Sequence, residues 1–409
     1  MNDLRDQKGS LHQSKSRLRH RRMKLLGAWF LVLLLLPASA KKKEKAVSLA
    51  IELGPEVQLI EGGTFPYMFR SREGTLALLA YVPAAEDPAR QARSPNGVPR
   101  TILSTDNGKT WHQWNPRPDQ GFGPMMEGSA VQTRDGSILV FDYVPESKGN
   151  GKLVNRRWQS KDQWKTFQGP EESHIEVPQA IDGGTADNGQ PIAPILFHRS
   201  VIELPNGDLL AGVYGWFKGD DSPSEYRFEM KKFRSLLLRS ADRGRHWKYL
   251  STIAVDPNIG QEGFPEPVLL RLTQGRHKGR ILCLMRTGRK NPIYQAESDD
   301  EGRTWTSPRP LDLIGVDPDL IEMDNGVLVC SFGHKPDFKD DGNFLAFSLD
   351  QGKTWTHVTR LSSVLTCAYT TVRQIGPNEL FVVYDERDPK DYRSRNRRIL
   401  GRQVHVTTP

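Results

Sequence analysis

The sequence predicts an all-β protein, a six-bladed β-propeller formed by a single repeat domain. Two recurring patterns predict this fold. The first is an eight-residue motif of the form S-x-D-x-G-x-T-W, and the second is a tight turn followed by a short apolar strand. Because the motif recurs along most of the chain, we expect the 409 residues to contain a leader and one large repeat domain.

The eight-residue motif occurs in four nearly complete copies and one degenerate copy. They begin at Ser104, Ser240, Ser298 and Ser348, and the degenerate copy begins at Ser160. The central Asp and Gly are turn formers, because Asp bonds to its own backbone and Gly tolerates a positive φ. The closing Trp is a large apolar anchor with one polar N–H. We therefore expect each motif to form a rigid hairpin corner, with its Asp as a turn former rather than a catalyst.

The turn-then-strand pattern occurs six times. Its copies begin at Glu73, Asp135, Asn206, Gly279, Asn325 and Asn378. In each of the first five units the turn is followed by one copy of the eight-residue motif before the next turn begins, so each unit has the strand order of a propeller blade. The sixth unit lacks the motif, and we expect residues 400–406 to pair with strands near residues 47–60 and close the ring. The longest insertions are residues 83–96, 182–194 and 216–228, and such loops often carry function.

The N-terminal segment 1–40 has the organisation of a basic leader with a signal peptide. Residues 19–24 are mostly basic, and residues 25–36 form an apolar run. Residues 37–40 end in the small-x-small pattern of a signal-peptide cleavage site, with Ala40 last. The run is too short to favour a membrane-spanning helix, although an uncleaved anchor is the alternative. We expect cleavage near Ala40, export to the periplasm or the medium, and a mature domain of residues 41–409 without a membrane span.

The formal net charge of +8 does not indicate a nucleic-acid partner. The leader segment 1–40 carries eight Lys/Arg and two Asp, a net of +6, which leaves +2 for the domain. The cysteines Cys283, Cys330 and Cys367 lie in apolar runs without metal-ligand spacing. We expect buried free thiols, with one disulfide as the alternative. No metal or cofactor is expected, and the protein is expected to be a monomer.

The first strand of each propeller blade lines the central channel. Here these strands begin at Thr64-Phe-Pro-Tyr67, Met126-Glu127, His198-Arg199, Pro265-Glu266, Asp317-Pro-Asp319 and Ala368-Tyr369. Four of the six segments carry a charged side chain, and the other two carry a Tyr. A ring of such side chains suggests a polar central site that suits a sugar or a sugar acid.

The eight-residue motif resembles the Asp-box, or BNR repeat, of sialidases and some other β-propellers. Glu266-Pro-Val-Leu-Leu, followed by Arg286 and the motif at Ser298, is similar to the sialidase segment with the paired Glu and a carboxylate-binding Arg. Ala368-Tyr369-Thr-Thr is similar to the segment with the nucleophilic Tyr. The resemblance implies an exo-α-sialidase-like glycoside hydrolase that acts on terminal sialic acid, or a related acidic sugar, of a glycan.

The resemblance also implies the role of each residue. Tyr369 would attack the sugar, Glu266 would take its proton, and Arg286 would bind the substrate carboxylate. An acid from the first long loop would protonate the leaving oxygen. Asp87 is the candidate for this acid, and Glu86 is the alternative.

Two of the three sialidase arginines have no counterpart in this sequence. Thr64-Phe65-Pro66 stands where sialidases have Arg-Ile-Pro, and residues 326–348 contain Lys335 but no Arg. A lysine is a point charge rather than a planar fork, so it is not an equivalent replacement. The candidates for the missing positive charge are Lys335, His198, Arg199 and Arg387.

Two other functions stay open. The missing arginines are compatible with a carbohydrate-binding propeller that does not turn its ligand over. A propeller glycosidase or lyase for a plant or algal polysaccharide would instead draw its carboxylates from Glu127, Glu266 and Asp319. The separation of the carboxyl groups distinguishes that enzyme from the Tyr mechanism.

Overall fold

The computed structural model describes residues 49–82, 97–125, 129–187, 189–334, 342–362, 366, 368–387 and 397–408. All of them belong to the compact unit Val47–Pro409. Apart from one 3-10 turn at Pro118–Gln120, the regular elements in these ranges are β-strands. Among the described residues, no helix is long and apolar enough to cross a membrane. The prediction of an all-β fold is confirmed.

Most strands pair with their neighbours in the chain and form antiparallel meanders. One four-stranded sheet contains β3 (Thr64–Arg70), β4 (Leu76–Val82), β5 (Val98–Ser104) and β6 (His112–Trp114). A second contains β18 (Val268–Arg271), β19 (Ile281–Met285), β20 (Pro292–Ser298) and β21 (Arg309–Ile314). A third contains β22 (Val316–Glu322), β23 (Leu328–His334), β24 (Gly342–Ser348) and β25 (Thr356–Ser362).

A nine-stranded sheet joins two further meanders. The first contains β7 (Ala130–Gln132), β8 (Ile138–Phe141), β9 (Glu146–Ser147), β10 (Lys152–Ser160) and β11 (Gln168–Glu176). The second contains β14 (Ile195–Glu203), β15 (Leu209–Gly215), β16 (Arg234–Ser240) and β17 (His246–Ala254). The outer strands β11 and β17 pair in parallel, with His174 opposite His246. A small ribbon of β12 (Gly184–Thr185) and β13 (Pro191–Ile192) precedes β14.

The last sheet combines both ends of the described chain. It contains β26 (Thr370–Gly376), β27 (Glu379–Arg387), β28 (Arg397–Thr407), β1 (Ala50–Leu53) and β2 (Val57–Glu61). One edge of β28 pairs with β27, and the other pairs with β1 and β2, so that Ala50 lies opposite Thr407 and Val57 lies opposite Gly401. The expected pairing of the C-terminal strand with the N-terminal strands is confirmed.

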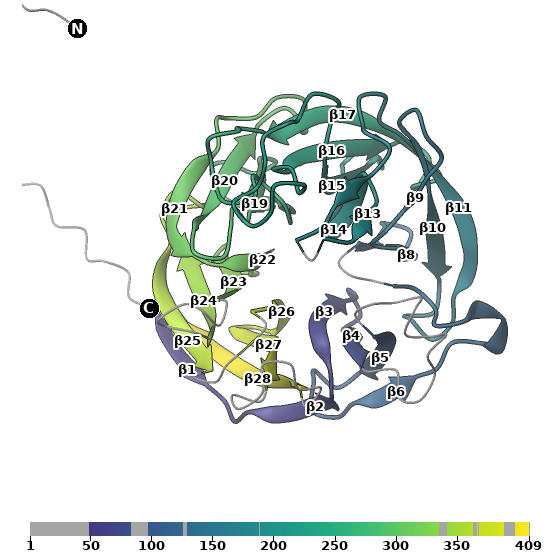
Figure 1. Cartoon of the computed structure of the whole chain (residues 1–409). Helices are drawn as coiled ribbons and strands as arrows, with labels where there is room; N and C mark the ends of the chain where they lie inside the picture. Colours follow the sequence, from purple (N-terminus) through teal and green to yellow (C-terminus); the bar gives the residue numbers. More distant parts are fainter. Residues whose placement is uncertain are drawn as a thin grey trace, which may run out of the picture. The chain divides into compact units, whose positions relative to one another are not determined.

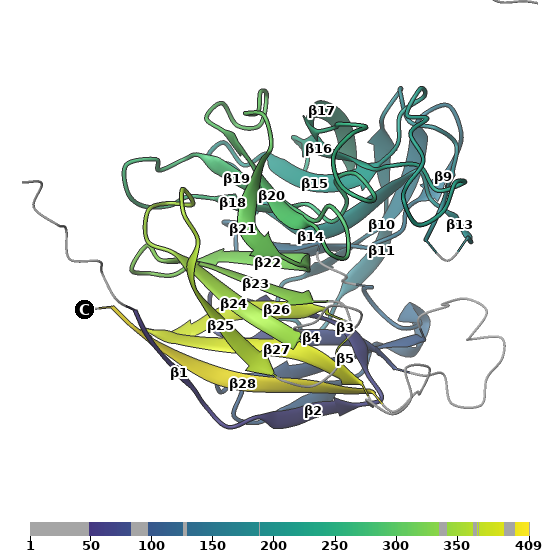
Figure 2. The same cartoon turned by 60° about the vertical axis from the view of Figure 1, so that its left-hand side comes forward.

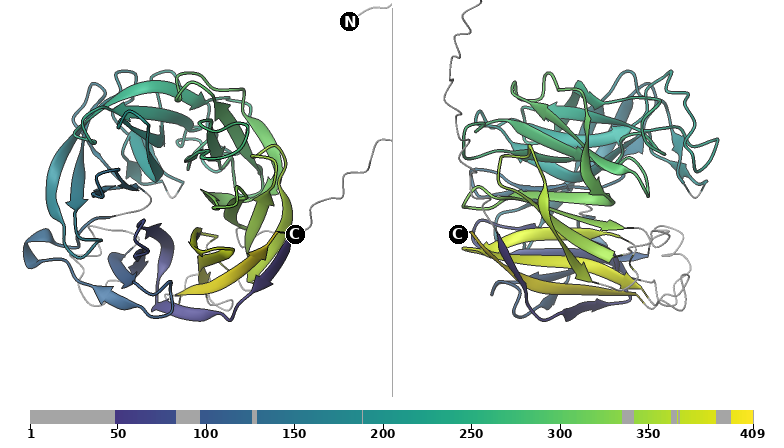
Figure 3. Two further views of the ribbon diagram at one scale, coloured as in Figure 1. Left: turned by 180° about the vertical axis from the view of Figure 1, so that it is seen from behind. Right: turned by 90° about the vertical axis from the view of Figure 1, so that its left-hand side faces the viewer.

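Figure 1 shows these sheets around a common centre, with β3, β14, β22 and β26 on the inside and β11, β17 and β21 on the outside. The turned view in Figure 2 shows the strands of the individual sheets lying side by side. Figure 3 shows the same ring from behind and from the side. Apolar side chains also join the two meanders of the nine-stranded sheet: the ring of Phe141 in β8 meets Trp247 in β17 edge-on, with ring centroids 5.2 Å apart.

The eight-residue motifs have the turn geometry that their sequence predicts. In the motif at Ser240, the Ser Oγ accepts the backbone N–H of Gly244 (2.8 Å), and Asp242 Oδ1 accepts the backbone N–H of His246 (2.9 Å). Although burial opposes ionisation, these hydrogen bonds to His246 and Ser240 lower the pKa of Asp242 to about 2. The degenerate motif at Ser160 makes the same two kinds of backbone hydrogen bond. The motif Asp residues are therefore turn formers.

Each complete motif also rests on another sheet or, for the motif at Ser240, on the other meander of the nine-stranded sheet. A Cβ added at Gly244 would lie 2.2 Å from the ring of Phe141 in β8, so only a glycine leaves room for this approach. The glycines of the other three complete motifs also lie directly against a side chain of another sheet: Gly302 against Leu237, Gly352 against Leu282, and Gly108 against Phe381. The last pair brings the first motif onto β27, which is where the two ends of the ring meet.

Candidate functional site

The inner strands share a strained backbone position at the centre of the ring. Non-glycine residues with positive φ stand at or before the starts of four of them and at the register shift of β14: Phe65 (53°), Arg199 (47°), Glu266 (54°), Asp317 (54°) and Ala368 (76°). The strand register shifts at this point in β3, β14 and β22. Such a conformation costs about 1–3 kcal/mol per residue and concentrates at functional sites. The repeated strain marks the centre as the candidate site.

Arg286 and two glutamates form the first charged cluster. Arg286 directly follows β19, and its Nη1 donates to Glu266 Oε1 (2.7 Å), while its Nε lies 2.5 Å from Glu262 Oε1. All three residues are buried. Burial alone would lower the pKa of Arg286, but Glu262, Glu266 and Tyr369 together raise it well above its ordinary value. Arg286 is therefore a permanent cation that lies close to Tyr369.

The third inserted loop reaches this cluster. Tyr226, within residues 216–228, donates its hydroxyl hydrogen to Gln261 (3.2 Å) and accepts the backbone N–H of Arg289 (2.8 Å). Burial and the charge of Glu262 raise the pKa of Tyr226 to about 12. The phenol stays neutral at physiological pH, and it lies close to Glu262 and Arg286.

Arg199 and Asp317 form the second charged cluster. Arg199 donates through Nη2 to Asp317 Oδ2 and through Nη1 to the carbonyl oxygen of Thr370 (2.6 Å). The backbone N–H of Asp317 donates to Glu266 Oε2 (3.1 Å), so the two clusters touch. Burial alone would lower the pKa of Arg199, but Asp317 and Asp319 raise it. Asp317 lies in a segment that the sequence indicated, yet its role became apparent only with its partners.

Asp319 binds residues of β26 rather than facing an open cavity. Its Oδ2 accepts hydrogen bonds from Thr371 Oγ1 (2.7 Å), from the backbone of Val372 (3.0 Å) and from Arg373 Nη1 (2.6 Å). Burial alone would raise the pKa of Asp319, but Arg373 and Arg199 lower it. The carboxylate is thus an anion that joins β22 to β26. Arg373 was not indicated by the sequence, because nothing along the chain links it to Asp319.

Tyr369 and His198 complete the centre. Tyr369 is half-buried, and its ring meets Phe65 edge-on with centroids 4.3 Å apart. His198 Nε2 lies 3.4 Å from Asp317 Oδ1, and the imidazole ring is flanked by Tyr143 and Tyr214. The site therefore combines a phenol, an imidazole, three arginines and four carboxylates: Tyr369, His198, Arg199, Arg286, Arg373, Glu262, Glu266, Asp317 and Asp319.

A further cation approaches the position of a missing sialidase arginine. Thr64 stands at that position, and its hydroxyl lies 3.4 Å from Asp385 Oδ2. Arg397, at the start of β28, donates to Thr64 Oγ1 (3.2 Å). No local pattern indicates this residue, because Arg397 and Thr64 are 333 positions apart in the chain.

Most of the remaining predicted residues lie outside the part of the chain that the structure describes, and the other two are cysteines. Asp87, Glu86, Glu127, Lys335 and Cys367 lie outside the described residues, and so does the side chain of Arg387. Cys283 and Cys330 are buried free thiols, as expected, and burial raises the pKa of both.

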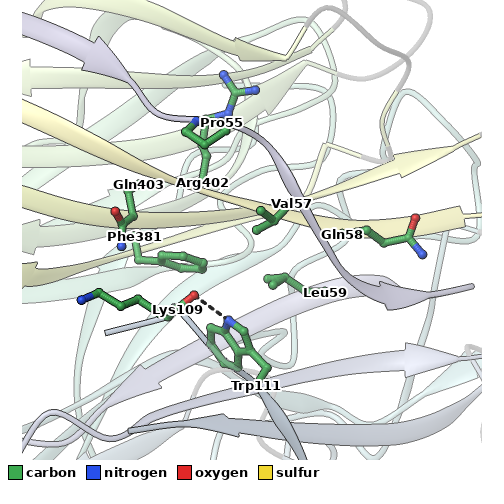
Figure 4. A pocket seen from close by; sticks show the side chains of 10 residues that line it. Pro55, Val57, Gln58, Leu59, Lys109, Trp111, Phe381, Arg402 and Gln403 are labelled. Atoms are coloured by element: carbon green, nitrogen blue, oxygen red, sulfur yellow. Dashed lines mark hydrogen bonds between the residues drawn. The ribbon is translucent and has the colours of Figure 1, made fainter. Parts of the chain in front are cut away.

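A separate cavity of about 540 Å³ lies where the ends of the ring meet. Figure 4 shows its lining side chains, which come from β2, β27, β28 and the first motif. Trp111 donates its indole N–H to the carbonyl oxygen of Gly108 (3.1 Å), the hydrogen bond drawn in that view. Lys109 and Arg402 supply positive charge, and no carboxylate is among the lining residues. The paired acids and bases that catalysis needs are therefore at the centre of the ring and not in this cavity.

Comparison with protein families gives two matches. The BNR repeat-like domain matches residues 124–377, and the BNR/Asp-box repeat matches residues 102–113. No curated protein matches the sequence.

Solved structures share the fold. A Dyadobacter fermentans protein of unknown function is 20% identical with a TM-score of 0.64, and the match covers 87% of this chain and 99% of that one. The Hadza microbial sialidase Hz136 is 16% identical with a TM-score of 0.56, over 85% of this chain and 65% of the sialidase. An α-L-arabinofuranosidase from Fusarium graminearum is 11% identical with a TM-score of 0.58, over 86% and 98% of the two chains. At these identities the likeness concerns the fold.

Proposed function

This chain belongs to the BNR repeat-like domain family, and we propose that it is a glycoside hydrolase whose catalytic centre contains Glu266, Arg286 and Tyr369. The observation that carries the proposal is the contact of Arg286 with Glu266 (2.7 Å) beside the half-buried Tyr369. A cation, a carboxylate and a phenol then converge at the narrow centre of the ring. These groups can bind an anionic sugar, accept a proton and attack an anomeric carbon.

The substrate we propose is a terminal sialic acid or a related acidic sugar. The carboxylate of such a sugar would repel a carboxylate nucleophile, whereas a neutral Tyr avoids that repulsion. In this mechanism Tyr369 attacks after Glu266 accepts its proton, and Arg286 binds the sugar carboxylate. Arg397, next to Thr64, supports a second contact with that carboxylate. Asp87 is proposed as the acid that protonates the leaving oxygen.

Hydrolysis of a panel of fluorogenic aryl glycosides tests the proposal. The panel contains an α-sialoside, a β-glucuronide and an α-L-arabinofuranoside. We expect the wild type to cleave the sialoside or the glucuronide, and Tyr369→Phe and Glu266→Gln each to lose at least ~10²-fold in kcat/KM. Tyr294→Phe, in β20, is the matched control and keeps wild-type activity. Equal kcat/KM in the wild type and in Tyr369→Phe would refute the Tyr mechanism.

A second candidate is a glycosidase for a neutral sugar that uses two carboxylates. Glu266 and Asp317 favour it, because one carboxylate oxygen of each lies within 4.8 Å of the other, and retaining enzymes also hold two carboxyl groups close together, ~5–5.5 Å apart. Asp317 then takes the role that the sequence suggested for Asp319. This enzyme would cleave the arabinofuranoside and would lose activity in Asp317→Asn but not in Tyr369→Phe. A wild type that binds glycans on an array but cleaves none of the panel would be a binding propeller.

We further propose six blades and export. The sheet order supports six blades: three four-stranded sheets, two meanders in the nine-stranded sheet, and the sheet that β28 closes. Export to the periplasm or the medium rests on the leader, and N-terminal sequencing of the mature protein tests for a start near Lys41. The proposed partner is a glycan substrate, bound by a monomer.

A further inference from the structure

We propose that His198, Glu266 and Asp317 form a binding site for one divalent transition-metal ion at the centre of the ring. His198 lies at the register shift of β14, Glu266 just before β18 and Asp317 at the start of β22. One ring nitrogen of His198 and one carboxylate oxygen of each acid all lie within 4.8 Å of one another. A cluster of this size is small enough for a single ion to contact all three residues.

The distance between His198 and Asp317 fits two ligands of one ion. His198 Nε2 and Asp317 Oδ1 are 3.4 Å apart, which exceeds the ~2.7–3.2 Å range of an N–H···O hydrogen bond. Two ligand atoms, each ~2.1 Å from a tetrahedral Zn²⁺, lie about 3.4 Å apart. The observed spacing therefore fits the edge of a metal coordination tetrahedron better than it fits a hydrogen bond.

Asp317 Oδ1 is a buried carboxylate oxygen without a hydrogen bond in the described part of the chain. Asp317 is fully buried, and Oδ1 has no hydrogen-bond partner among the described residues. Its other oxygen is already bound by Arg199. A buried carboxylate oxygen without a partner is costly, and a metal ion between Oδ1 and His198 removes that cost.

Neighbouring groups already hold the two proposed carboxylate ligands in place. Arg199 donates a hydrogen bond to Asp317 Oδ2, the oxygen that does not face His198, and so orients the carboxylate. Arg286 donates to Glu266 Oε1. The backbone N–H of Asp317 donates to Glu266 Oε2, so the positions of the two carboxylates are coupled. Hydrogen bonds of this kind from outer groups are typical of metal sites, where they fix the orientation of the ligands.

The ligand set narrows the choice of ion. One imidazole and two carboxylates suit Zn²⁺ or Mn²⁺, whereas Ca²⁺ prefers oxygen ligands alone. The site goes beyond the proposed glycoside hydrolysis and does not require it, although a bound ion could act as a Lewis acid beside Glu266. The sequence carries no metal motif, because the three ligands are 68 and 51 positions apart along the chain.

Isothermal titration of the chelator-stripped full-length protein with ZnCl2 and MnCl2, without substrate, tests the site. We expect one ion per chain, and His198→Ala to weaken binding at least ~100-fold. His198→Gln, which keeps the side chain long and neutral, is a second variant in case the alanine variant unfolds. His174→Ala removes an exposed histidine of β11 and should bind like the wild type.

Thermal unfolding provides the second readout. An ion that binds the folded state raises Tm, so Zn²⁺ or Mn²⁺ should raise the Tm of the wild type and of His174→Ala but not of His198→Gln. The proposal is overturned if the wild type binds neither ion, or if the His198 variants bind as tightly as the wild type. Because neither readout involves a sugar, this result is independent of the test of hydrolysis.

Discussion

Arg199 and Arg286 reach the centre from different sheets, and each is neutralised by buried carboxylates. The pair of Arg199 with Asp317 joins β14 to β22, although a whole sheet lies between these strands in the chain. Taking such charges out of water costs several kcal/mol per ion, and the mutual attraction offsets this cost only while both partners are present. Removing one partner therefore lowers the free energy of unfolding by much more than the whole pair contributes to it.

Asp317→Asn should destabilise the protein strongly. The substitution removes the carboxylate that Arg199 binds most closely and leaves only the more distant Asp319 (3.9 Å) as its counter-charge, and we expect a loss of ~3–5 kcal/mol in the free energy of unfolding. Asp299→Asn is the matched control, because Asp299 also pairs with an arginine but has a side chain that is 69% exposed. Its loss should not exceed about 1 kcal/mol. Urea unfolding of metal-free protein measures both, and similar losses in the two variants would contradict the role given to Asp317.

The residues of the site differ in how well the sequence indicates them. Glu266, Arg286 and Tyr369 stand in short motifs whose order resembles that of sialidases. Arg373 and Arg397 have no such signal, because each acts on a residue of another strand. A side chain can be identified from local sequence when its neighbours along the chain define its role, and only from the fold when its partners are distant.

At the scale of elements, each eight-residue motif serves two purposes. Its Ser and Asp close the turn through local hydrogen bonds, which the sequence predicts. Its Gly also brings the turn onto the side chain of another sheet, and this contact depends on the packing of the ring. The same residues thus shape one hairpin and align it with the next sheet.

The contact between turn and sheet predicts different effects for two glycines. Gly244 and Gly136 both have positive φ, at 77° and 86°. An added Cβ meets Phe141 at Gly244, whereas it meets nothing within 4 Å at Gly136. Gly136→Ala should lose ~1–2 kcal/mol from backbone strain alone, and Gly244→Ala a further ~1–3 kcal/mol from overpacking.

Chemical denaturation of the two variants measures the difference. Equal losses would show that the turn at Gly244 is not held against Phe141 in solution. A larger loss in Gly244→Ala would establish the motif as a contact between neighbouring meanders of the ring.

At the scale of the whole molecule, the ring depends on the pairing of β28 with β1 and β2. Leu49 and Ile60 are buried in the apolar clusters that this pairing covers. Without these strands, one edge of β28 would lose its hydrogen bonds and the core beneath would be exposed to water.

A chain that begins at Gly62 should therefore be less stable than one that begins at Val47. Each buried aliphatic side chain that is lost costs ~1.5–3 kcal/mol, and a change of 1 kcal/mol moves Tm by ~2–4 °C in a large domain. We expect Tm to fall by at least ~5 °C on removal of β1 and β2. Thermal unfolding followed by circular dichroism measures the difference, and equal Tm values would refute the closing role of these strands.

The sequence by itself determined the all-β class, the repeat, the turn role of the motif Asp residues and the pairing of the two chain ends. These features depend on local hydrogen bonds and strand periodicity, which neighbouring residues specify. Only the tertiary structure decided which charges meet at the centre, because a ring brings together side chains from strands that are distant in the chain. The pairing of Arg199 with Asp317, the binding of Asp319 by Arg373 and the cluster of His198 with two acids all arise in this way.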